Sequence, residues 1–500
     1  MEIDRAAFDR LIAEGYNSVA LTRTLQLDRD TPVSLYARLA PDHAFALLES
    51  AAVGEGTGRY SFIALDRQWR VTTRDGATVV EGATPSGQTD EPLEVIRELL
   101  SRHRAAPEAD LPLAGGAFGY VAYDYVRRLE RLEKDPGVDP WPDLDFSLAG
   151  ALLVCDHVRH VTTIAVTAAV AAGDDPSVAW ERAASRLDEI ETLLMSPAPR
   201  DPAVEKLVAS APRRKTEVNV RDLAARISNF TLERYSAAVE KVKGHIFAGD
   251  IFQAVPSQQF RRPTSANPLT LYRILRSLNP SPYMYLLDTG EAQLVGASPE
   301  MLVNVKDCVV TTRPIAGTRP RGETDQRDRE LEEELLANEK EIAEHVMLVD
   351  LGRNDVGRVS EPGTVVVERL ARVERFSHLM HLVSQVSGTL REDLDAIDAL
   401  AALFPAGTLS GAPKIRAMEI IDEVEPVRRG PYGGALGYFA LDGDADFAIT
   451  IRTVALRHGW ATIQAGGGVV ADSTGEGEYY ECLTKASAPL LALEITDPAL

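Results

Sequence analysis

The stretch Pro314-Ile315-Ala316-Gly317-Thr318-Arg319-Pro320-Arg321 is the most informative part of this chain. Its third residue, Ala316, carries no nucleophilic group. If the stretch lines a reaction site, the group that enters the reaction must therefore come from a free molecule. The segments that follow it supply acidic, glycine-rich and basic elements.

An acidic helix is predicted over residues 328–349. Glu341, Glu344 and His345 share one face of it, because residues three and four apart are neighbours on a helix. On spacing alone a solvated acidic face is the favoured interpretation, since charged runs on helices are usually surface features. The predicted apolar stripe of this helix consists of Leu331, Leu335, Ile342, Val346 and Val349.

The last predicted helix covers residues 476–488 and ends at Pro489. Glu478, Glu481 and Lys485 lie at positions i, i+3 and i+7 and face one way. Taken alone, this spacing favours a salt-bridged surface. If the two acidic helices face each other, however, their carboxylates suit Mg²⁺, which prefers one or two protein carboxylates together with waters and substrate oxygens.

Three consecutive glycines, Gly466, Gly467 and Gly468, follow a predicted strand at residues 460–465. Glycine lets backbone N–H groups approach a ligand closely and form an anion-binding nest. A bulge or tight bend explains the triplet equally well. No GxGxxG pattern surrounds it, so a nucleotide site is not indicated.

His381 and Arg452 lie in apolar surroundings. A lone histidine in such a setting is more often a structural residue than a catalyst. Arg452 interrupts a strand-like run at residues 449–454, and a buried guanidinium needs an anionic partner. A ligand carboxylate gripped in a bidentate manner would serve, as would a protein Asp or Glu.

Composition is that of a globular protein. The 500 residues are 45% hydrophobic and 26% charged, with a net charge of −22. So acidic a chain is a poor candidate for binding nucleic acid, and any anion site in it must be built locally. Three dispersed cysteines show no disulfide or metal spacing, which suits the cytoplasm. Neither a signal peptide nor an apolar run of about 18 residues is present, so no membrane association is expected.

The order of elements favours an α+β fold. Short β-like runs at residues 61–64, 71–73 and 149–155 mix with predicted helices at 92–104 and 178–194, without regular crossover helices. Four prolines in residues 196–220 predict a linker, which divides the chain into an N-terminal region (1–195), the linker and a C-terminal domain (221–495). A helix is predicted over residues 231–248, with Val239, Val242, Ile246 and Phe247 along one side.

The opening stretch resembles the Pro-Ile-x-Gly-Thr-x-x-Arg motif of the chorismate-utilising enzymes. Within that family the chain is similar to anthranilate synthase component I. The resemblance covers residues 232–493 in order, and it implies packed β-sheets with helices outside and an N-terminal region that shares or packs on the same core. Other matching stretches are Asp250-Ile251-Phe252-Gln253, Gly296-Ala297-Ser298-Pro299-Glu300, Arg353-Asn354-Asp355, Gly407-Thr408-Leu409-Ser410-Gly411 and Tyr432-Gly433-Gly434.

The resemblance implies a role for each candidate residue. Glu344 and Glu481 would hold Mg²⁺ against the ring carboxylate of chorismate. Glu300 would protonate the leaving C4 hydroxyl, and His381 and Thr408 would lie beside the ring, with His381 favoured for the loss of pyruvate. The remaining implied substrate-binding residues are Gly317, Thr318, Tyr432, Arg452, Gly466, Gly467, Gly468 and Lys485.

Two positions bear on the nucleophile. Water-adding relatives carry a lysine where this chain has Gln253, and aminodeoxychorismate synthases often carry a lysine where it has Ala316. The resemblance therefore implies a Mg²⁺-dependent carbon–oxygen lyase that adds ammonia at C2 and releases anthranilate and pyruvate, the first step of tryptophan biosynthesis. Aminodeoxyisochorismate synthase, which stops before pyruvate is lost, remains an alternative, as does aminodeoxychorismate synthase.

Partners and regulation are also implied. None of the cysteines lies in the Gly-x-Cys-x-Gly motif of a glutaminase, so a separate glutamine amidotransferase subunit is expected, in a heterotetramer. Leu-Leu-Glu-Ser, ending at Ser50, resembles an element that binds tryptophan as a feedback inhibitor. A tryptophan sensor without activity is a further, weaker alternative. The partner element of the inhibitor site is Asn279, Pro280, Ser281, Pro282, Tyr283 and Met284.

Overall fold

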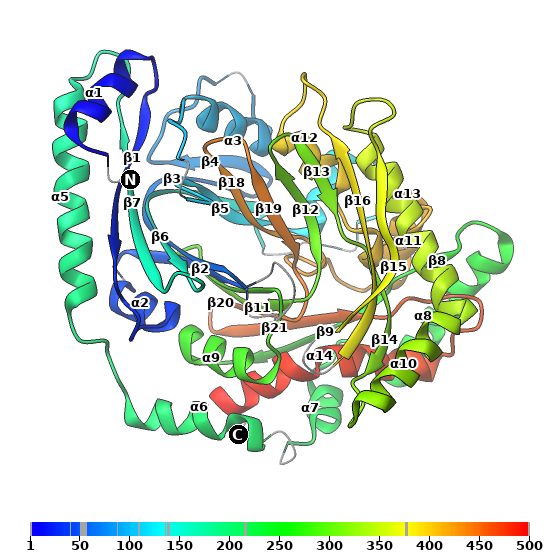
Figure 1. Ribbon diagram of the computed structural model, residues 1–500. Helices are drawn as coiled ribbons and strands as arrows, with labels where there is room; N and C mark the ends of the chain where they lie inside the picture. The colour runs from blue at the N-terminus through cyan, green and yellow to red at the C-terminus, as the bar shows by residue number, and fades with distance from the viewer. Residues whose placement is uncertain are drawn as a thin grey trace.

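The chain forms one continuous hydrogen-bonded sheet that curls over into two layers and is surrounded by helices (Figure 1). The computed structural model describes residues 3–40, 42–50, 58–87, 89–108, 111–135, 137, 141–214, 218–375 and 379–498. The helices in these residues are α1 (Arg5–Ala13), α2 (Pro32–Leu39), α3 (Pro92–Ser101), α4 (Val126–Leu129), α5 (Pro176–Met195), α6 (Pro202–Arg214), α7 (Val220–Ile227), α8 (Leu232–Ala248), α9 (Pro268–Leu278), α10 (Asp325–Ala337), α11 (Glu339–Gly357), α12 (Ala396–Leu403), α13 (Lys414–Val424) and α14 (Gly475–Thr496), with the 3₁₀ turns η1 (Tyr123–Tyr125) and η2 (Gly407–Leu409).

Two long paired strands, β3 (Tyr60–Arg74) and β6 (Leu144–Asp156), join the layers. Every residue of β6 is buried, which suits a strand covered on both faces. The first layer extends from β3 through β2 (Ala44–Glu49), β10 (Tyr283–Asp288), β11 (Ala292–Ser298), β20 (Thr453–Arg457), β21 (Trp460–Gly466) and β9 (Ser257–Pro263).

The second layer extends from the first half of β6. It runs through β5 (Gly116–Val121), β18 (Ala435–Ala440), β19 (Ala445–Ile449), β12 (Met301–Lys306), β13 (Val309–Thr312) and β16 (Leu379–Thr389), which also pairs with β14 (Ile315–Pro320) and β15 (Val366–Arg375). The other strands are β1 (Ser18–Leu25), β4 (Ala77–Glu81) and β7 (Val161–Ala169), with β8 (Gln253–Ala254) and β17 (Gly411–Ala412) in a separate pair.

N-terminal strands lie inside both layers. Strand β2 pairs with β3 on one edge and with β10 on the other, and β5 lies between β6 and β18. The predicted α+β fold, in which the N-terminal region shares the core of the C-terminal region, is therefore confirmed. The division at residues 195 and 220 stays a prediction, although the predicted linker contains helix α6.

The chain crosses between the layers twice, and the two crossings lie side by side. One joins β11 to β12 through Glu300, and the other joins β19 to β20 through Arg452. Ile449 N–H donates to the Glu300 carbonyl over 3.0 Å, and Ala297 N–H donates to the Arg452 carbonyl over 3.3 Å. These bonds hold an acid, Glu300, and a cation, Arg452, at the junction of the layers.

The acidic segment after β14 forms two helices, so the prediction of one helix over residues 328–349 is wrong. Asn338 ends α10 and also caps α11, because its side-chain oxygen accepts a hydrogen bond from Glu341 N–H. Asparagine favours such positions since its side chain competes for backbone groups. The break changes the helical phase, and Val346 of the predicted stripe is 39% exposed.

The last helix continues beyond Pro489, so the predicted stop is also wrong. Proline removes one backbone hydrogen bond and crowds the preceding turn. The second half of α14 offsets this cost because its apolar side chains are buried under β21 and beside α8 and α9 (Figure 1). These buried residues are Leu490, Leu491, Leu493 and Ile495.

Smaller differences have local causes. Phe247 is 74% exposed and does not belong to the buried side of α8, whereas Val239 and Val242 do. The runs predicted at residues 61–64 and 71–73 are parts of the single strand β3. Arg452 lies in the crossing and not in a strand, with a φ of 53°.

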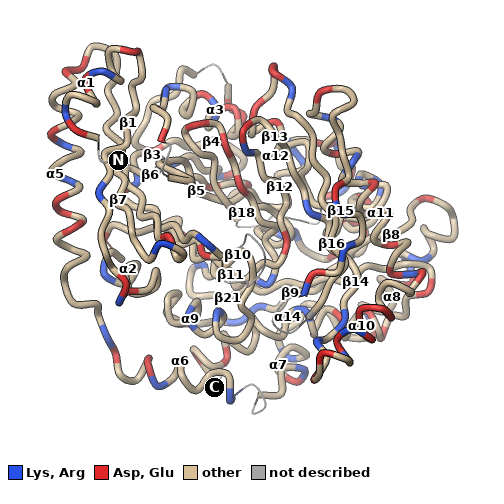
Figure 2. Tube along the Cα trace, in the orientation of Figure 1, with Lys and Arg blue, Asp and Glu red and all other residues tan. Residues whose placement is uncertain are grey.

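Charged residues are mixed over the surface of the molecule. Acidic side chains are dense on α10, while Lys and Arg are scattered among acidic residues on the other helices (Figure 2). In the parts of the chain that the structure describes, no helix combines the length and the apolar character that a membrane crossing requires.

A buried ion pair holds together the loops beneath the junction. Arg429, which is 3% exposed, donates to the carbonyls of Leu409 and Val255 and pairs with Glu425 at 2.6 Å. Glu425 in turn accepts hydrogen bonds from the N–H and hydroxyl of Ser257. Removal of either charge would leave the other buried without a partner.

We expect Arg429→Met to destabilise the protein by about 3–5 kcal/mol, since Glu425 would remain as an unpaired buried charge. The measurement is the urea concentration at half-unfolding. The control is Arg353→Met, which breaks an exposed pair with Asp350 and should cost about 0–1 kcal/mol. Equal midpoints for Arg429→Met and the unaltered protein would contradict this assignment.

Candidate active site

A cavity of about 1040 Å³ lies at the junction of the two layers. Strands β14 and β16, helices α11 and α14 and both crossings contribute to its wall. Every predicted catalytic, substrate-binding and metal-binding residue except Gly467 lines it: Glu300, Gly317, Thr318, Glu344, His381, Thr408, Tyr432, Arg452, Gly466, Gly468, Glu481 and Lys485.

Glu300 supplies a protonated acid. Its side chain is buried at the end of the first crossing, and burial raises its pKa to about 8, although the charges of Lys485 and Arg452 offset part of the effect. A carboxyl group with this pKa carries a proton at neutral pH and can donate it. This is the arrangement that protonation of a poor leaving group requires.

Arg452 supplies a buried cation to the cavity, with Glu481 and Glu300 near enough to interact with its charge. Among the described residues it forms no salt bridge, and burial lowers its pKa. The aromatic ring of Tyr432 lies nearby, and its hydroxyl approaches Gly466, where an added Cβ would be only 3.0 Å away. An anionic ligand would complete this side of the cavity.

Carboxylates gather on the opposite wall. Burial raises the pKa of Glu344, and the charges of Glu341 and Glu481 raise it further, while a hydrogen bond from Gln253 (3.1 Å) lowers it. Burial also raises the pKa of Glu478.

These oxygens fit a divalent cation. Oε2 of Glu478 is buried without a hydrogen-bond partner, and a cation would relieve the repulsion between Glu344, Glu478 and Glu481. The described residues hold no ready cluster of three or more His, Cys, Asp or Glu ligands. Mg²⁺ does not need one, because waters and substrate oxygens complete its coordination.

The glycine triplet offers fewer donors than predicted. Gly466 ends β21 and is paired with Ser257, and Gly467 N–H donates to the carbonyl of Pro256 at 3.3 Å. Within the described residues, Gly467 N–H is thus engaged by a backbone carbonyl, whereas Gly468 N–H has no backbone acceptor. The triplet also permits close packing, since a Cβ on Gly467 would lie 2.4 Å from Oε2 of Glu478.

His381 is held by β14. Its Nδ1 lies 3.0 Å from Thr318 Oγ1 and 3.2 Å from the carbonyl oxygen of Gly317. Because a carbonyl only accepts, Nδ1 carries the proton, and in the neutral ring the lone pair is on Nε2. Burial lowers the pKa of His381, as does the charge of Arg452, so the neutral ring is favoured.

A family model described as "chorismate binding enzyme" matches residues 44–491. The chain belongs to the chorismate-binding enzymes. It is 47% identical to anthranilate synthase component 1 of Mycolicibacterium smegmatis, over 97% of this chain and 92% of that protein. It is 44% identical to anthranilate synthase component 1 of Pseudomonas aeruginosa over the full length of both.

Solved structures agree with this membership. Anthranilate synthase component I from Streptococcus pneumoniae superposes with a TM-score of 0.73 at 35% identity, covering 94% of this chain and 99% of that one. The menaquinone-specific isochorismate synthase from Escherichia coli gives a TM-score of 0.68 at 18% identity, covering 98% and 99%, and shares the fold.

A second cavity of this chorismate-binding enzyme, of about 810 Å³, lies beside β2 and β10. Only some of the residues predicted to bind an inhibitor line this cavity. Ser50, Pro282, Tyr283 and Met284 line it, because Met284 of β10 pairs with Glu49 of β2. Asn279 instead lines the first cavity, and Pro280 and Ser281 line neither.

The sequence predictions did not assign every residue at the two cavities. The spacing of the last helix indicated Glu478 beside Glu481, but only Glu481 was predicted as a metal ligand. Asp446 and Asn304 approach the second cavity from neighbouring strands, and no spacing in the sequence predicts that meeting.

We expect Glu300→Gln to gain thermal stability over the unaltered protein as pH rises. Glu300 ionises near pH 4.5 in the unfolded chain but at about 8 when folded. The stability that protonated Glu300 contributes below its unfolded-state pKa is therefore lost as the pH rises through its folded-state pKa. Gln does not titrate, so the variant avoids this loss. Tm is measured from about pH 5 to about pH 8; a difference between the two proteins that stays constant would contradict this.

Proposed function

We propose that this protein converts chorismate and ammonia to anthranilate and pyruvate with Mg²⁺, as the large subunit of an anthranilate synthase. One observation carries the proposal: the buried acid Glu300 and the unpaired cation Arg452 face one cavity that also holds the carboxylates. Chorismate has two carboxylates and a poor leaving hydroxyl, so it needs both kinds of group.

Arg452 and Tyr432 bind the enolpyruvyl carboxylate in this proposal, with Gly468 N–H as a further donor. Glu344 and Glu481 would hold Mg²⁺, with Glu478 beside them. The ion neutralises the ring carboxylate when bound. Lys485 pairs with Glu481 at 2.7 Å and donates to the Gly466 carbonyl, which positions that carboxylate.

In the first step the nitrogen of ammonia bonds to C2, both conjugated ring double bonds shift and the C4–oxygen bond breaks. Glu300 donates a proton to the departing hydroxyl, which leaves as water, and the new ammonium group then loses a proton. Thr408 contacts the ring beside Glu300. Neither Ala316 nor Gln253, both in the cavity wall, can act as a nucleophile or base, which favours ammonia over lysine or water.

In the second step Nε2 of His381 takes the proton from C2, and the C3–oxygen bond breaks. The enolpyruvyl group takes up a proton and leaves as pyruvate, while the ring becomes aromatic. The orientation of His381 by Gly317 and Thr318 supports completion of this step and distinguishes the proposal from an aminodeoxyisochorismate synthase.

Ammonia comes from a separate glutamine amidotransferase subunit in this proposal. The thiols of Cys155 and Cys482 are buried, and burial raises the pKa of each to about 12, so neither is a thiolate at neutral pH. Cys308 is exposed in the turn between β12 and β13.

Tryptophan occupies the second cavity in this proposal. The aromatic rings of Tyr60, Phe62 and Tyr438 form one wall, which suits an indole ring. Asp446 lies in the wall beside the side chains of Tyr283 and Asn304 and forms no salt bridge within the described residues, and burial raises its pKa to about 7. A ligand ammonium group would supply its missing cation.

The first test uses the purified chain with chorismate, Mg²⁺ and an ammonium salt at mildly alkaline pH. We expect anthranilate fluorescence that requires both additions and decreases with tryptophan. Chorismate loss without anthranilate or pyruvate would indicate an enzyme that halts at the aminated intermediate.

The Glu344→Gln variant distinguishes an enzyme from a sensor. It should require at least about tenfold more Mg²⁺ for turnover, because it removes a charged ligand. Tryptophan binding measured by calorimetry should be retained. No turnover by the unaltered chain, with tryptophan binding intact, would support the sensor instead.

We expect Asp446→Asn to weaken tryptophan binding at least about tenfold, since the ammonium group would lose a charged partner. Calorimetry measures the dissociation constant directly. Asp442→Asn is the matched control, because Asp442 lies on the exposed turn between β18 and β19. Equal affinities for both variants would remove Asp446 from the site.

A further inference from the structure

The N-terminal region lies directly behind the wall of the large cavity without lining it. Every described residue that lines this cavity is at position 220 or beyond. Turn η1 follows strand β5, which pairs with β18, and it contacts the segment of residues 429–434 that carries Tyr432. The steps of the proposed reaction do not use this contact.

Two hydrogen bonds hold Gly430 against η1. Tyr123 N–H donates to the Gly430 carbonyl over 2.8 Å, and Gly430 N–H donates to Oδ2 of Asp124 over 2.8 Å. Both backbone groups of Gly430 are therefore satisfied by two consecutive residues of the N-terminal region. This pairing fixes the place at which the segment approaches the cavity.

The guanidinium of Arg429 contacts two aromatic rings. Its Cζ atom is 4.4 Å from the ring centre of Tyr123 and 5.6 Å from the ring centre of Tyr432. The negative face of an aromatic ring attracts a cation, and the attraction is stronger when both groups are removed from water, as they are here. The ring of Tyr123 thus acts on the position of Tyr432 through the cation that they share.

Gly433 lets the ring of Tyr123 pack closely against the same segment. Its φ is 76°, which favours glycine, and an added Cβ would lie 3.3 Å from Cδ2 of Tyr123. Gly433 N–H also donates to the carbonyl of Thr450 over 2.9 Å. Since Thr450 precedes Arg452 by two positions, the contact with Tyr123 also supports the second crossing.

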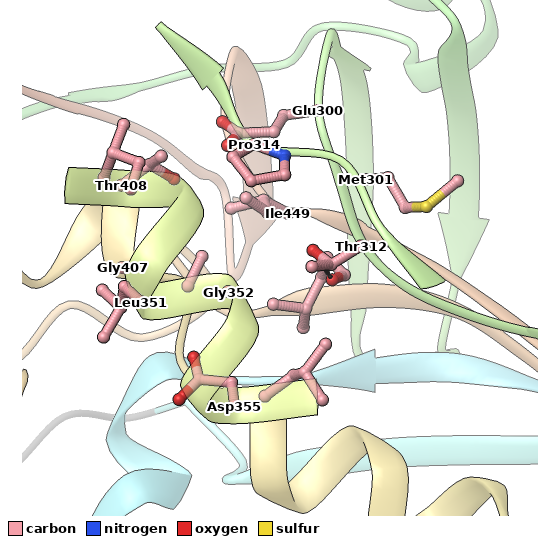
Figure 3. Close-up of a pocket in the computed structure, with 14 residues that line it drawn as sticks. Glu300, Met301, Thr312, Pro314, Leu351, Gly352, Asp355, Gly407, Thr408 and Ile449 are labelled. Carbon is pink, nitrogen blue, oxygen red and sulfur yellow. Dashed lines mark hydrogen bonds between the residues drawn. The ribbon is translucent and has the colours of Figure 1, made fainter. Parts of the chain in front are cut away.

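Arg429 itself is a poor choice for testing this contact, because it holds the acid side of the cavity as well. It donates to the carbonyl of Leu409 in η2 over 2.7 Å. The preceding residue, Thr408, lies with Glu300 at one end of a small cavity of about 40 Å³ (Figure 3). A change at Tyr123 removes the ring contact and leaves the hydrogen bonds of Arg429 in place.

The hydroxyl group of Tyr123 takes no part in this contact. Its oxygen is buried and makes no hydrogen bond of good geometry within the described residues. The attraction to Arg429 requires only the face of the ring. Phenylalanine at this position should therefore keep the contact, whereas leucine should lose it.

We propose that Tyr123 is a positioning residue for the part of the active site that binds the enolpyruvyl carboxylate. It acts through Arg429 on Tyr432 and, by way of Gly433, on Arg452. The inference rests on the proposed function, because that function assigns this carboxylate to Tyr432 and Arg452. The N-terminal region thereby takes part in substrate binding in addition to lining the second cavity.

The test compares the chorismate kinetics of Tyr123→Leu and Tyr123→Phe with those of the unaltered chain, at saturating Mg²⁺ and ammonium. Tyr123→Leu should raise KM about tenfold and change kcat less than about twofold, because the carboxylate is bound equally in the substrate and in the transition state of the first step. Tyr123→Phe should change neither constant more than about twofold. An unchanged KM for Tyr123→Leu, or a fall in kcat alone, would overturn the proposal.

Two competitive inhibitors show which part of the site is disturbed. 3-(Carboxymethoxy)benzoate has a ring carboxylate and a side-chain carboxylate, whereas 3-methoxybenzoate lacks the side-chain carboxylate. Tyr123→Leu should raise the inhibition constant of the first compound about tenfold and that of the second less than about twofold. An equal rise for both compounds would count against the proposal, because it would show a general change in the cavity.

Phe439→Leu is the matched control for lost packing. Phe439 and Tyr123 are each 2% exposed and belong to the same buried cluster, but Phe439 lies in β18 and does not line the described wall of the large cavity. This control should lower Tm as Tyr123→Leu does and leave the KM for chorismate unchanged. A rise in KM equal to that of Tyr123→Leu would reduce Tyr123 to a merely structural residue.

Gly433→Ala is a second variant, which keeps the test decisive if Tyr123→Leu does not fold. Its added Cβ presses on the ring of Tyr123, so KM should rise in the same direction by a smaller factor. Unchanged KM values in every folded variant would overturn the positioning role and leave the proposed function intact. Absence of chorismate turnover by the unaltered chain would instead overturn the proposed function.

Discussion

The active-site cavity depends on the fact that the chain passes between the two sheet layers at two adjacent places. Each crossing interrupts a strand, and the freed backbone groups bond to the other crossing. The polar side chains at these points, Glu300 and Arg452, thereby enter a region that apolar strands enclose on both sides. Neither layer alone could place an acid and a cation opposite each other at this depth.

The same arrangement carries energetic costs that the surrounding structure must offset. Arg452 has a left-handed backbone conformation, Glu300 is buried as a carboxylic acid, and carboxylates on α11 and α14 repel one another. Strain and unpaired charge of this kind concentrate at functional sites. Here the extensive core of both layers and the buried pair of Arg429 and Glu425 hold the costly groups in place.

Much of the architecture could be predicted from the sequence, because ordered motifs indicated the family and the family has one fold. The candidate catalytic and metal-binding residues could be picked out because each lies in a recognisable motif, and the structure places them around one cavity, while their roles stay predictions. Asn338 and Pro489 were misread because helix caps and tertiary packing decide whether such residues end a helix. Asn279 and Met284 are only five positions apart, yet they line different cavities. Spacing along the sequence could not predict this, because it does not show where the turn between α9 and β10 lies relative to each cavity.

Pro299 and Ile315 belong to the walls of both large cavities. A ligand that shifts these residues in one cavity thus alters the shape of the other, and thermodynamic linkage makes the effect mutual. If a compound in the second cavity changes the affinity for the substrate by some factor, the substrate changes the affinity for that compound by the same factor. A compound in the second cavity that weakens substrate binding would accordingly need a higher concentration to act when the substrate is abundant.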